Sequence, residues 1–171
     1  MNHEQYFSLL PEIVRQMDKS AFLVAGADPI NPMTIGWAEF GWVWGRPVAT
    51  VMVRKSRFTY GLMEQADHFT VCVPAPDTFV KELAYCGSRS GRDGDKLAKA
   101  GLSAIPAKSY AGEVVGNCGI YVECKKVLRA ETDLAQMDPS IRAKFYGANQ
   151  AGGNGDPHVL YFGEVTEAYR G

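Results

Sequence analysis

A dense succession of short strand patterns, with only a few helical ones between them, most constrains the fold of this chain. Runs rich in β-branched and aromatic residues, bounded by turn-forming residues, predict strands over 21–26, 33–37, 40–44, 48–54, 68–74, 102–106, 117–128 and 159–168. The first two are expected to form a hairpin, and 117–128 is long enough to bend or bulge. Because strands and helices do not alternate regularly, the pattern favours a mainly β, antiparallel barrel with short peripheral helices over a doubly wound sheet.

Five short helices are expected around this barrel. Apolar spacing and capping residues place them at 6–17, from Ser56 onward, and at 78–85, 93–100 and 138–146. Pro11 suggests that the first helix proper starts near that residue. Asp77 or Thr78 is the expected cap of the third helix, whereas Asp138 caps the last one and Pro139 occupies its first position.

Composition and net charge limit the classes of protein to which this chain can belong. A length of 171 residues, 46% of them hydrophobic, fits one domain over 1–171 with a real core, and no linker or repeat divides the chain. The net charge of -1 argues against a general nucleic-acid or membrane surface, so any anion site must be local. The first residues lack a signal-peptide pattern, and the most apolar stretch, near 36–44, contains Glu39 and is too short to cross a bilayer. We therefore expect a cytoplasmic protein with neither nucleic acid nor membrane among its partners.

The four cysteines are scattered and contain no Cys-x-x-Cys pair, which disfavours a metal site. Cys72 and Cys124 lie in apolar strand patterns, where small buried thiols are the better interpretation. Cys86 stands next to a basic segment that could lower the pKa of its thiol, but packing at a helix end is favoured there too.

Residues 86–96 combine glycines, hydroxyl groups and cations ahead of a helical pattern. Gly87 belongs to a turn that would expose backbone N–H groups, Ser88 and Ser90 add hydroxyl donors, and Lys96 with two arginines adds positive charge. Such a segment can hold a phosphate or another anion. A plain turn followed by an aspartate-capped helix explains the same residues equally well.

Three motifs in a fixed order make the interpretation specific. They read Asn-x-Met-Thr-x-Gly-Trp at 31–37, Val-Arg-x-Ser-Arg-x-Thr at 53–59 and Cys-Gly-x-x-Ser-Gly-Arg-Asp-x-Asp-Lys at 86–96. In this combination the chain resembles the flavin reductase-like family with the FMN-binding split barrel, especially its flavoredoxin-like branch. The resemblance covers about 21–102, and 163–165 is similar to the family's last strand. It implies a homodimer with FMN near the subunit interface.

The helix start at 54–59 is a second place for an anion. Ser56 and Thr59 can cap the helix, or they can donate to a phosphate held at its positive end; the two roles are compatible. Arg54 and Arg57 flank this helix start, which favours the FMN phosphate.

The strand at 48–54 has one apolar and one polar face. Alternation puts Ala49, Val51 and Val53 toward the core. The residues on the other face are Thr50, Met52 and Arg54. A hydroxyl, a thioether and a cation suit one side of a flavin. They also suit a half-buried strand at a subunit interface.

The resemblance further implicates residues of the first motif and two later ones. Asn31, Thr34 and Trp37 are expected to meet the ribityl chain and the ring, although Trp37 alone would also fit a core position. Lys96 would approach the flavin or its phosphate; otherwise it pairs with a neighbouring aspartate on the surface. His158 follows a Gly- and Asn-rich segment, 147–157, that is predicted to be a mobile loop, and it either reaches the cofactor or caps this loop.

The resemblance implies an FMN-dependent oxidoreductase in which NADH or NADPH reduces the flavin and electrons pass to another flavin or a protein. The flavin carries such chemistry, so the chain needs no catalytic triad, and none is predicted. Without a Gly-x-Gly-x-x-Gly motif, a nicotinamide would bind only transiently over the flavin. The alternatives are a flavoredoxin-type FMN electron carrier with little NAD(P)H oxidase activity, and a module that has lost its flavin.

Overall fold

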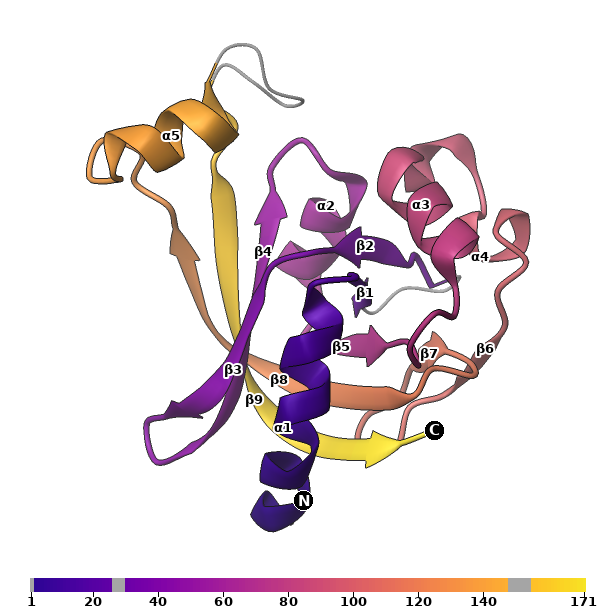
Figure 1. Ribbon diagram of the computed structural model, residues 1–171. Helices are drawn as coiled ribbons and strands as arrows, with labels where there is room; N and C mark the ends of the chain where they lie inside the picture. The colour runs from indigo at the N-terminus through magenta and orange to yellow at the C-terminus, as the bar shows by residue number, and fades with distance from the viewer. Residues whose placement is uncertain (1, 26–29, 148–154) are drawn as a thin grey trace.

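A curled antiparallel sheet of seven strands forms a half-barrel in the computed structural model, which describes residues 2–25, 30–147 and 155–171 (Figure 1). The strand order is β2-β1-β5-β8-β9-β4-β3. The strands are β1 (Ala21–Ala25), β2 (Met33–Ile35), β3 (Ala38–Val43), β4 (Arg46–Arg54), β5 (His68–Val73), β8 (Ile120–Glu131) and β9 (His158–Arg170). The mainly β architecture with short helices confirms the predicted fold class.

The long central pair, β8 and β9, gives the sheet its curvature. Their register shifts between Glu123 and Cys124 and again between Lys126 and Leu128. Bulges of this kind bend a strand and increase its twist, so the pair runs through both limbs of the half-barrel (Figure 1). The bend predicted for 117–128 is confirmed. A second, two-stranded sheet joins β6 (Ala104–Pro106) to β7 (Glu113–Val115), and the latter strand was not predicted.

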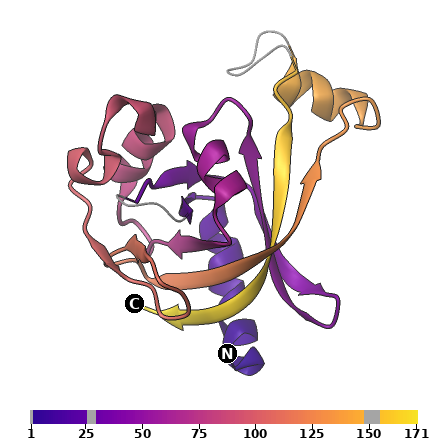
Figure 2. The same ribbon diagram turned by 180° about the vertical axis from the view of Figure 1, so that it is seen from behind.

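Helices pack around the sheet and along its rim. They are α1 (His3–Met17), α2 (Phe58–Gln65), α3 (Val80–Ser88), the 3-10 turn η1 (Gly91–Asp93), α4 (Lys96–Lys99) and α5 (Pro139–Tyr146). From both sides, α2 lies between α5 and α3 (Figures 1 and 2). The rim of the half-barrel around α2 is therefore where distant parts of the chain meet.

The core follows the alternation predicted for β4. Ala49, Val51 and Val53 are fully buried, whereas Met52 and Arg54 are half-buried. The hairpin of β1 and β2 is confirmed, with Phe22 opposite Thr34. All four cysteines are free and buried, which confirms the packing predicted for Cys72, Cys86 and Cys124.

The first helix begins earlier than predicted. Asn2 caps α1 by accepting a hydrogen bond from the Glu4 backbone N–H at 3.0 Å, and Pro11 lies inside the helix on its exposed side. The turn before Pro11 is held by Tyr6, which is fully buried and donates to the Val48 carbonyl. This tertiary packing outweighs the hydrogen bond that a proline removes from a helix.

Turn geometry corrects three further predictions. Trp44 and Gly45 both have positive φ (54° and 71°) and form the tight turn between β3 and β4, so β4 starts at Arg46. Helix α3 starts only after Phe79, which is itself left-handed, so neither Asp77 nor Thr78 caps it. The helix predicted over 93–100 is split, because Gly94 adopts φ 111° between η1 and α4.

The C-terminal helix matches its prediction. Asp138 caps α5 through the backbone N–H groups of Ser140 and Ile141, and Pro139 is its first residue. Most of the predicted mobile loop, 148–154, lies outside the described residues. In the part of the chain that the structure describes, no helix is both long and apolar enough to cross a membrane.

Candidate functional site

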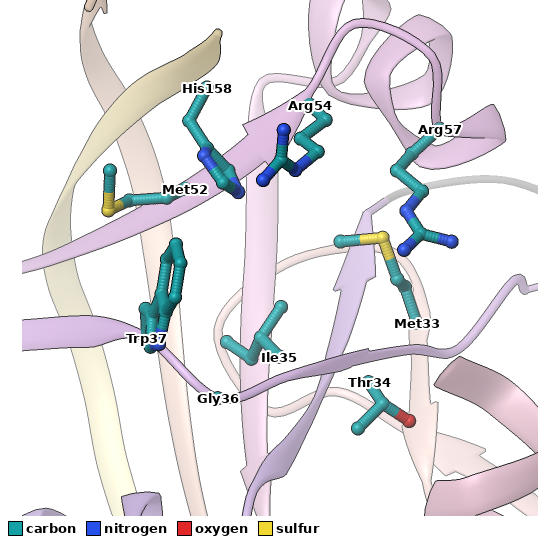
Figure 3. Close-up of a pocket in the computed structure, with 9 residues that line it drawn as sticks. All are labelled: Met33, Thr34, Ile35, Gly36, Trp37, Met52, Arg54, Arg57 and His158. Carbon is teal, nitrogen blue, oxygen red and sulfur yellow. The ribbon is translucent and has the colours of Figure 1, made fainter. Parts of the chain in front are cut away.

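Two cavities adjoin each other on either side of Arg57 and Met33, which line both. The first, here called the aromatic cavity, measures about 180 Å³ and is lined by Met33, Thr34, Ile35, Gly36, Trp37, Met52, Arg54, Arg57 and His158 (Figure 3). The second, the basic cavity, measures about 160 Å³ and is lined by Met33, Ser56, Arg57, Phe58, Thr59, Cys86, Ser88, Arg89, Ser90, Gly91, Arg92 and Lys96. All three sequence motifs thus meet at one place.

Strand β2 and helix α3 are held together behind the cavities. The Thr34 hydroxyl donates to the Leu83 carbonyl at 2.6 Å, so it points away from the aromatic cavity (Figure 3). A Cβ at Gly87 would lie 3.3 Å from the Thr34 Cβ, which is tighter than usual. Gly87 therefore permits the close approach of α3 and lines neither cavity. Thr34 and Gly87 shape the site by packing.

A buried amide supports the Thr59 hydroxyl, which lines the basic cavity. Asn31 Nδ2 donates to Thr59 Oγ1 at 2.9 Å, and both side chains are buried. Because Thr59 accepts this bond, its own hydroxyl proton is available to an acceptor in the cavity. Among the described residues, Asn31 Oδ1 has no hydrogen-bond partner although it is buried. The backbone at Gly91 packs so closely on Asn31 and Phe58 that a Cβ there would overlap both.

Lys96 is a buried cation in the wall of the basic cavity. Its side chain is 4% exposed, and Nζ donates to the Cys86 carbonyl at 2.8 Å. Within the described ranges, no carboxylate lies within 4.0 Å of it. The alternative of a surface pair is therefore wrong: Asp95 instead caps α4 through the Ala98 backbone N–H. Burial lowers the pKa of Lys96, with an opposing contribution from Cys86. A charge desolvated in this way is stabilised by an anion.

The remaining polar groups of the basic cavity are partly engaged. Ser56 does not cap α2; its hydroxyl donates to Asp156 Oδ2 at 2.6 Å, because the segment before β9 lies beside it. The Ser88 hydroxyl donates to the Ala84 carbonyl, and Ser90 Oγ accepts from the Arg92 backbone N–H. Burial raises the pKa of the Cys86 thiol, which supports the packing role predicted for it.

Arg54 does not accompany Arg57 at the basic cavity. Its guanidinium donates to the carbonyls of Asp156 at 2.9 Å and Phe145 at 2.7 Å, and it lies 5.0 Å from the Tyr146 ring centroid. Both arginines flank the start of α2 along the chain, but only Arg57 lines the basic cavity; Arg54 fastens α5 and the segment before β9 to the end of β4.

The aromatic cavity is walled by Trp37, Met52 and His158 (Figure 3). Trp37 is 42% exposed and meets Phe145 edge-on at 5.0 Å and His158 at 5.3 Å, so a core role is excluded for it. Burial, with Arg54 next in effect, lowers the pKa of His158 to about 4, so its imidazole is neutral at pH 7. Thr50 is buried on β4 but lines neither cavity.

Sequence reasoning missed the contribution of α5. Phe145 and Tyr146 hold Trp37, Arg54 and His158 in place, yet their segment carries no recognisable motif. Arg89 and Arg92 were counted as charges of the basic segment but not assigned to the site, and both line the basic cavity.

Comparison with known proteins identifies the family. Residues 20–171 match the model of the flavin reductase like domain. An uncharacterized protein of Archaeoglobus fulgidus is 25% identical over 114 residues, which cover 67% of this chain and 63% of that protein.

Two solved structures share the fold. The flavoredoxin of Desulfovibrio vulgaris has a TM-score of 0.67 at 21% identity, over 89% of this chain and 69% of that one. An FMN-binding protein from Thermus thermophilus, with bound 1-cyclohex-2-enone, has a TM-score of 0.63 at 18% identity, over 88% and 68%. Because the family model spans nearly the whole chain, this protein belongs to the flavin reductase-like family.

Proposed function

We propose that the chain binds FMN, with the phosphate in the basic cavity and the isoalloxazine ring in the aromatic cavity, and that it serves as an NAD(P)H-dependent flavin reductase. The observation that carries this proposal is the junction of the two cavities at Arg57 and Met33. One ligand with an anionic end and a planar apolar end fits such a pair. FMN is such a ligand.

The basic cavity offers what a phosphate requires. Lys96 is buried without a carboxylate among the described residues, and Thr59 has a hydroxyl proton to donate. Arg57 and Arg92 add charge at its rim. Hydrogen bonds to a charged phosphate contribute about 1.5–3 kcal/mol each, more than neutral ones. Asn31 lines neither cavity, and its contribution is to orient the Thr59 hydroxyl from behind the basic cavity.

The aromatic cavity suits a flat ring. Trp37 supplies an apolar π-surface and Met52 a polarisable thioether, while the neutral His158 adds no charge. When bound, FMN would accept a hydride from NADH or NADPH at its N5 atom. The chain's own duties are then to position the ring, exclude water and leave one face open to the nicotinamide.

Anaerobic reduction tests this function. The purified protein, loaded with FMN, is mixed with NADH or NADPH, and bleaching of the flavin absorbance is followed by stopped flow. We expect bleaching within seconds to minutes and reoxidation when free flavin is admitted. FMN binding without bleaching would instead identify a flavoredoxin-type electron carrier, and failure to quench FMN fluorescence would exclude both functions.

We further propose that the β3–β4 hairpin is a homodimer interface. Trp42 and Trp44 are 48% and 56% exposed, and Phe7 packs beside Trp42 with a centroid distance of 5.7 Å. Strand β3 is at the edge of the sheet, and the exposed tryptophans lie on this strand and in the turn that follows it. Light scattering should give twice the chain mass for the wild type and a single mass for Trp44→Glu. A monomeric wild type at micromolar concentration would contradict the proposal.

A further inference from the structure

Helix α5 delivers a tyrosine to the histidine of the aromatic cavity. The Tyr146 hydroxyl lies 2.7 Å from His158 Nδ1, and the two rings meet nearly at right angles, 88°. Both side chains are buried, with exposed fractions of 6% and 8%. Since Nδ1 is occupied by Tyr146, Nε2 is the ring nitrogen left for a ligand in the cavity that His158 lines.

The position of one proton distinguishes two arrangements of this pair. If Tyr146 donates to Nδ1, the neutral imidazole carries its proton on Nε2. If Nδ1–H donates instead, the phenol proton needs another acceptor, and the described residues offer Tyr146 none. A buried donor without an acceptor is costly, so the first arrangement is favoured.

The charges around His158 keep it neutral. Arg54 from the end of β4 and Arg57 from the start of α2 disfavour its protonation, and Asp156 of the preceding segment favours it. Burial and the arginines prevail, and the pKa falls to about 4. The pKa of the Tyr146 phenol is raised by burial, so this group keeps its proton as well.

We propose that Tyr146 is a positioning residue that fixes His158 in the tautomer with the proton on Nε2, so that the aromatic cavity presents a neutral N–H donor to its ligand. The recognised atom is then an acceptor, a carbonyl oxygen or an unprotonated ring nitrogen of the flavin, and not an N–H group. The identity of the ligand rests on the proposed function; the tautomer does not.

Nitrogen-15 NMR of the ligand-free protein tests the tautomer directly. The chain has three histidines, so subtraction of the His158→Gln spectrum assigns the imidazole. Long-range proton–nitrogen correlations should show Nε2 protonated and Nδ1 bare at pH 7. A proton on Nδ1, a doubly protonated ring or an equal mixture of tautomers would overturn the proposal. This experiment gives its answer whether or not the protein binds FMN.

Two variants separate positioning from mere packing. Tyr146→Phe keeps the ring but removes the hydroxyl, and we expect His158 to become a mixture of tautomers. A near-equal mixture leaves about half of the molecules with the Nε2–H donor, so FMN should bind about twofold more weakly. Tyr60→Phe is the matched control. The Tyr60 hydroxyl contacts Arg129 at 3.4 Å and Tyr60 lines neither cavity, so its removal should change neither the tautomer nor the affinity for FMN.

The FMN titration completes the test. Addition of FMN to the wild type should shift the Nε2–H resonance of His158, as expected for a new hydrogen bond. If FMN binds and this resonance does not move, the recognition step is refuted. An unchanged tautomer in a folded Tyr146→Phe protein would refute the positioning role.

Discussion

The two cavities differ in how their polar groups are employed. In the aromatic cavity the protein itself satisfies them: two carbonyls accept from Arg54, and Tyr146 holds His158. In the basic cavity Lys96 is buried without a carboxylate among the described residues, and the Thr59 hydroxyl proton is free to be donated. The difference teaches that the aromatic cavity ties Arg54 and His158 to other parts of the chain, whereas the basic cavity keeps a buried lysine charge, as a site with a planar ring at one end and a phosphate at the other requires.

The largest expected effect is the pH dependence that His158 gives to stability. Its folded pKa is about 4, below the ordinary value of 6.5, so between these values the unfolded chain binds more protons than the folded one. Stability is therefore complete above about pH 6.5 and falls as the pH drops toward 4. The shift corresponds to a loss of about 3 kcal/mol.

Urea unfolding of the wild type and of His158→Asn between pH 7 and pH 4.5 measures this effect. The variant should lose less stability over this range than the wild type. His3→Gln, at the exposed start of α1, serves as the control. Parallel curves for wild type and His158→Asn would show that the aromatic cavity does not depend on a neutral imidazole.

The next effect should fall on the basic cavity alone. Lys96→Met keeps an unbranched side chain, one atom shorter, and removes the buried charge, so FMN should bind about 10- to 150-fold more weakly, the equivalent of about 1.5–3 kcal/mol. Riboflavin, which lacks the phosphate, should be nearly unaffected. Fluorescence titration with both ligands checks this.

Lys99→Met is the matched control for that variant, because Lys99 Nζ donates to the Asp93 carbonyl and does not line the basic cavity. Its affinity for FMN should stay close to that of the wild type. If Lys96→Met weakened the binding of riboflavin as much as that of FMN, the assignment of the phosphate to the basic cavity would be wrong.

The smallest effect should be found in the aromatic cavity and should be shared by both ligands. Trp37→Leu removes a π-surface worth about 0.5–1.5 kcal/mol, or about two- to tenfold in affinity, for FMN and riboflavin alike. The same titrations measure it, with Ile105→Ala on β6 as an exposed apolar control. A loss confined to FMN would place the phosphate, and not the ring, beside Trp37.

Much of the fold was predictable because local patterns carry it. The alternation in β4 identified the buried face of Ala49, Val51 and Val53, and Asp138 with Pro139 located the start of α5. Predictions failed where tertiary contacts override local signals. Packing of Tyr6 extends α1 through its proline, and Asp156 takes the hydroxyl of Ser56 away from α2.

The candidate site was predictable to a similar degree. Thr59, Lys96 and Trp37 line the cavities as the motifs indicated. Asn31 and Gly87 lie behind them and act through Thr59 and Thr34. Sequence separation explains the omission of Tyr146, since nothing local marks a helix that docks on a strand far earlier in the chain.

The sequence by itself determined the chemistry available to this protein: an antiparallel β framework, a segment rich in cations and hydroxyl groups, and buried thiols at Cys72, Cys86 and Cys124. Only the tertiary structure decided how that chemistry is divided. It assigned Arg54 to carbonyls of α5 and of the segment before β9, left Lys96 as a buried charge facing the basic cavity, and paired Tyr146 with His158. The physical reason is that residue type fixes which bonds a side chain can make, whereas long-range packing fixes which partners it meets and which of its groups stay free for a ligand.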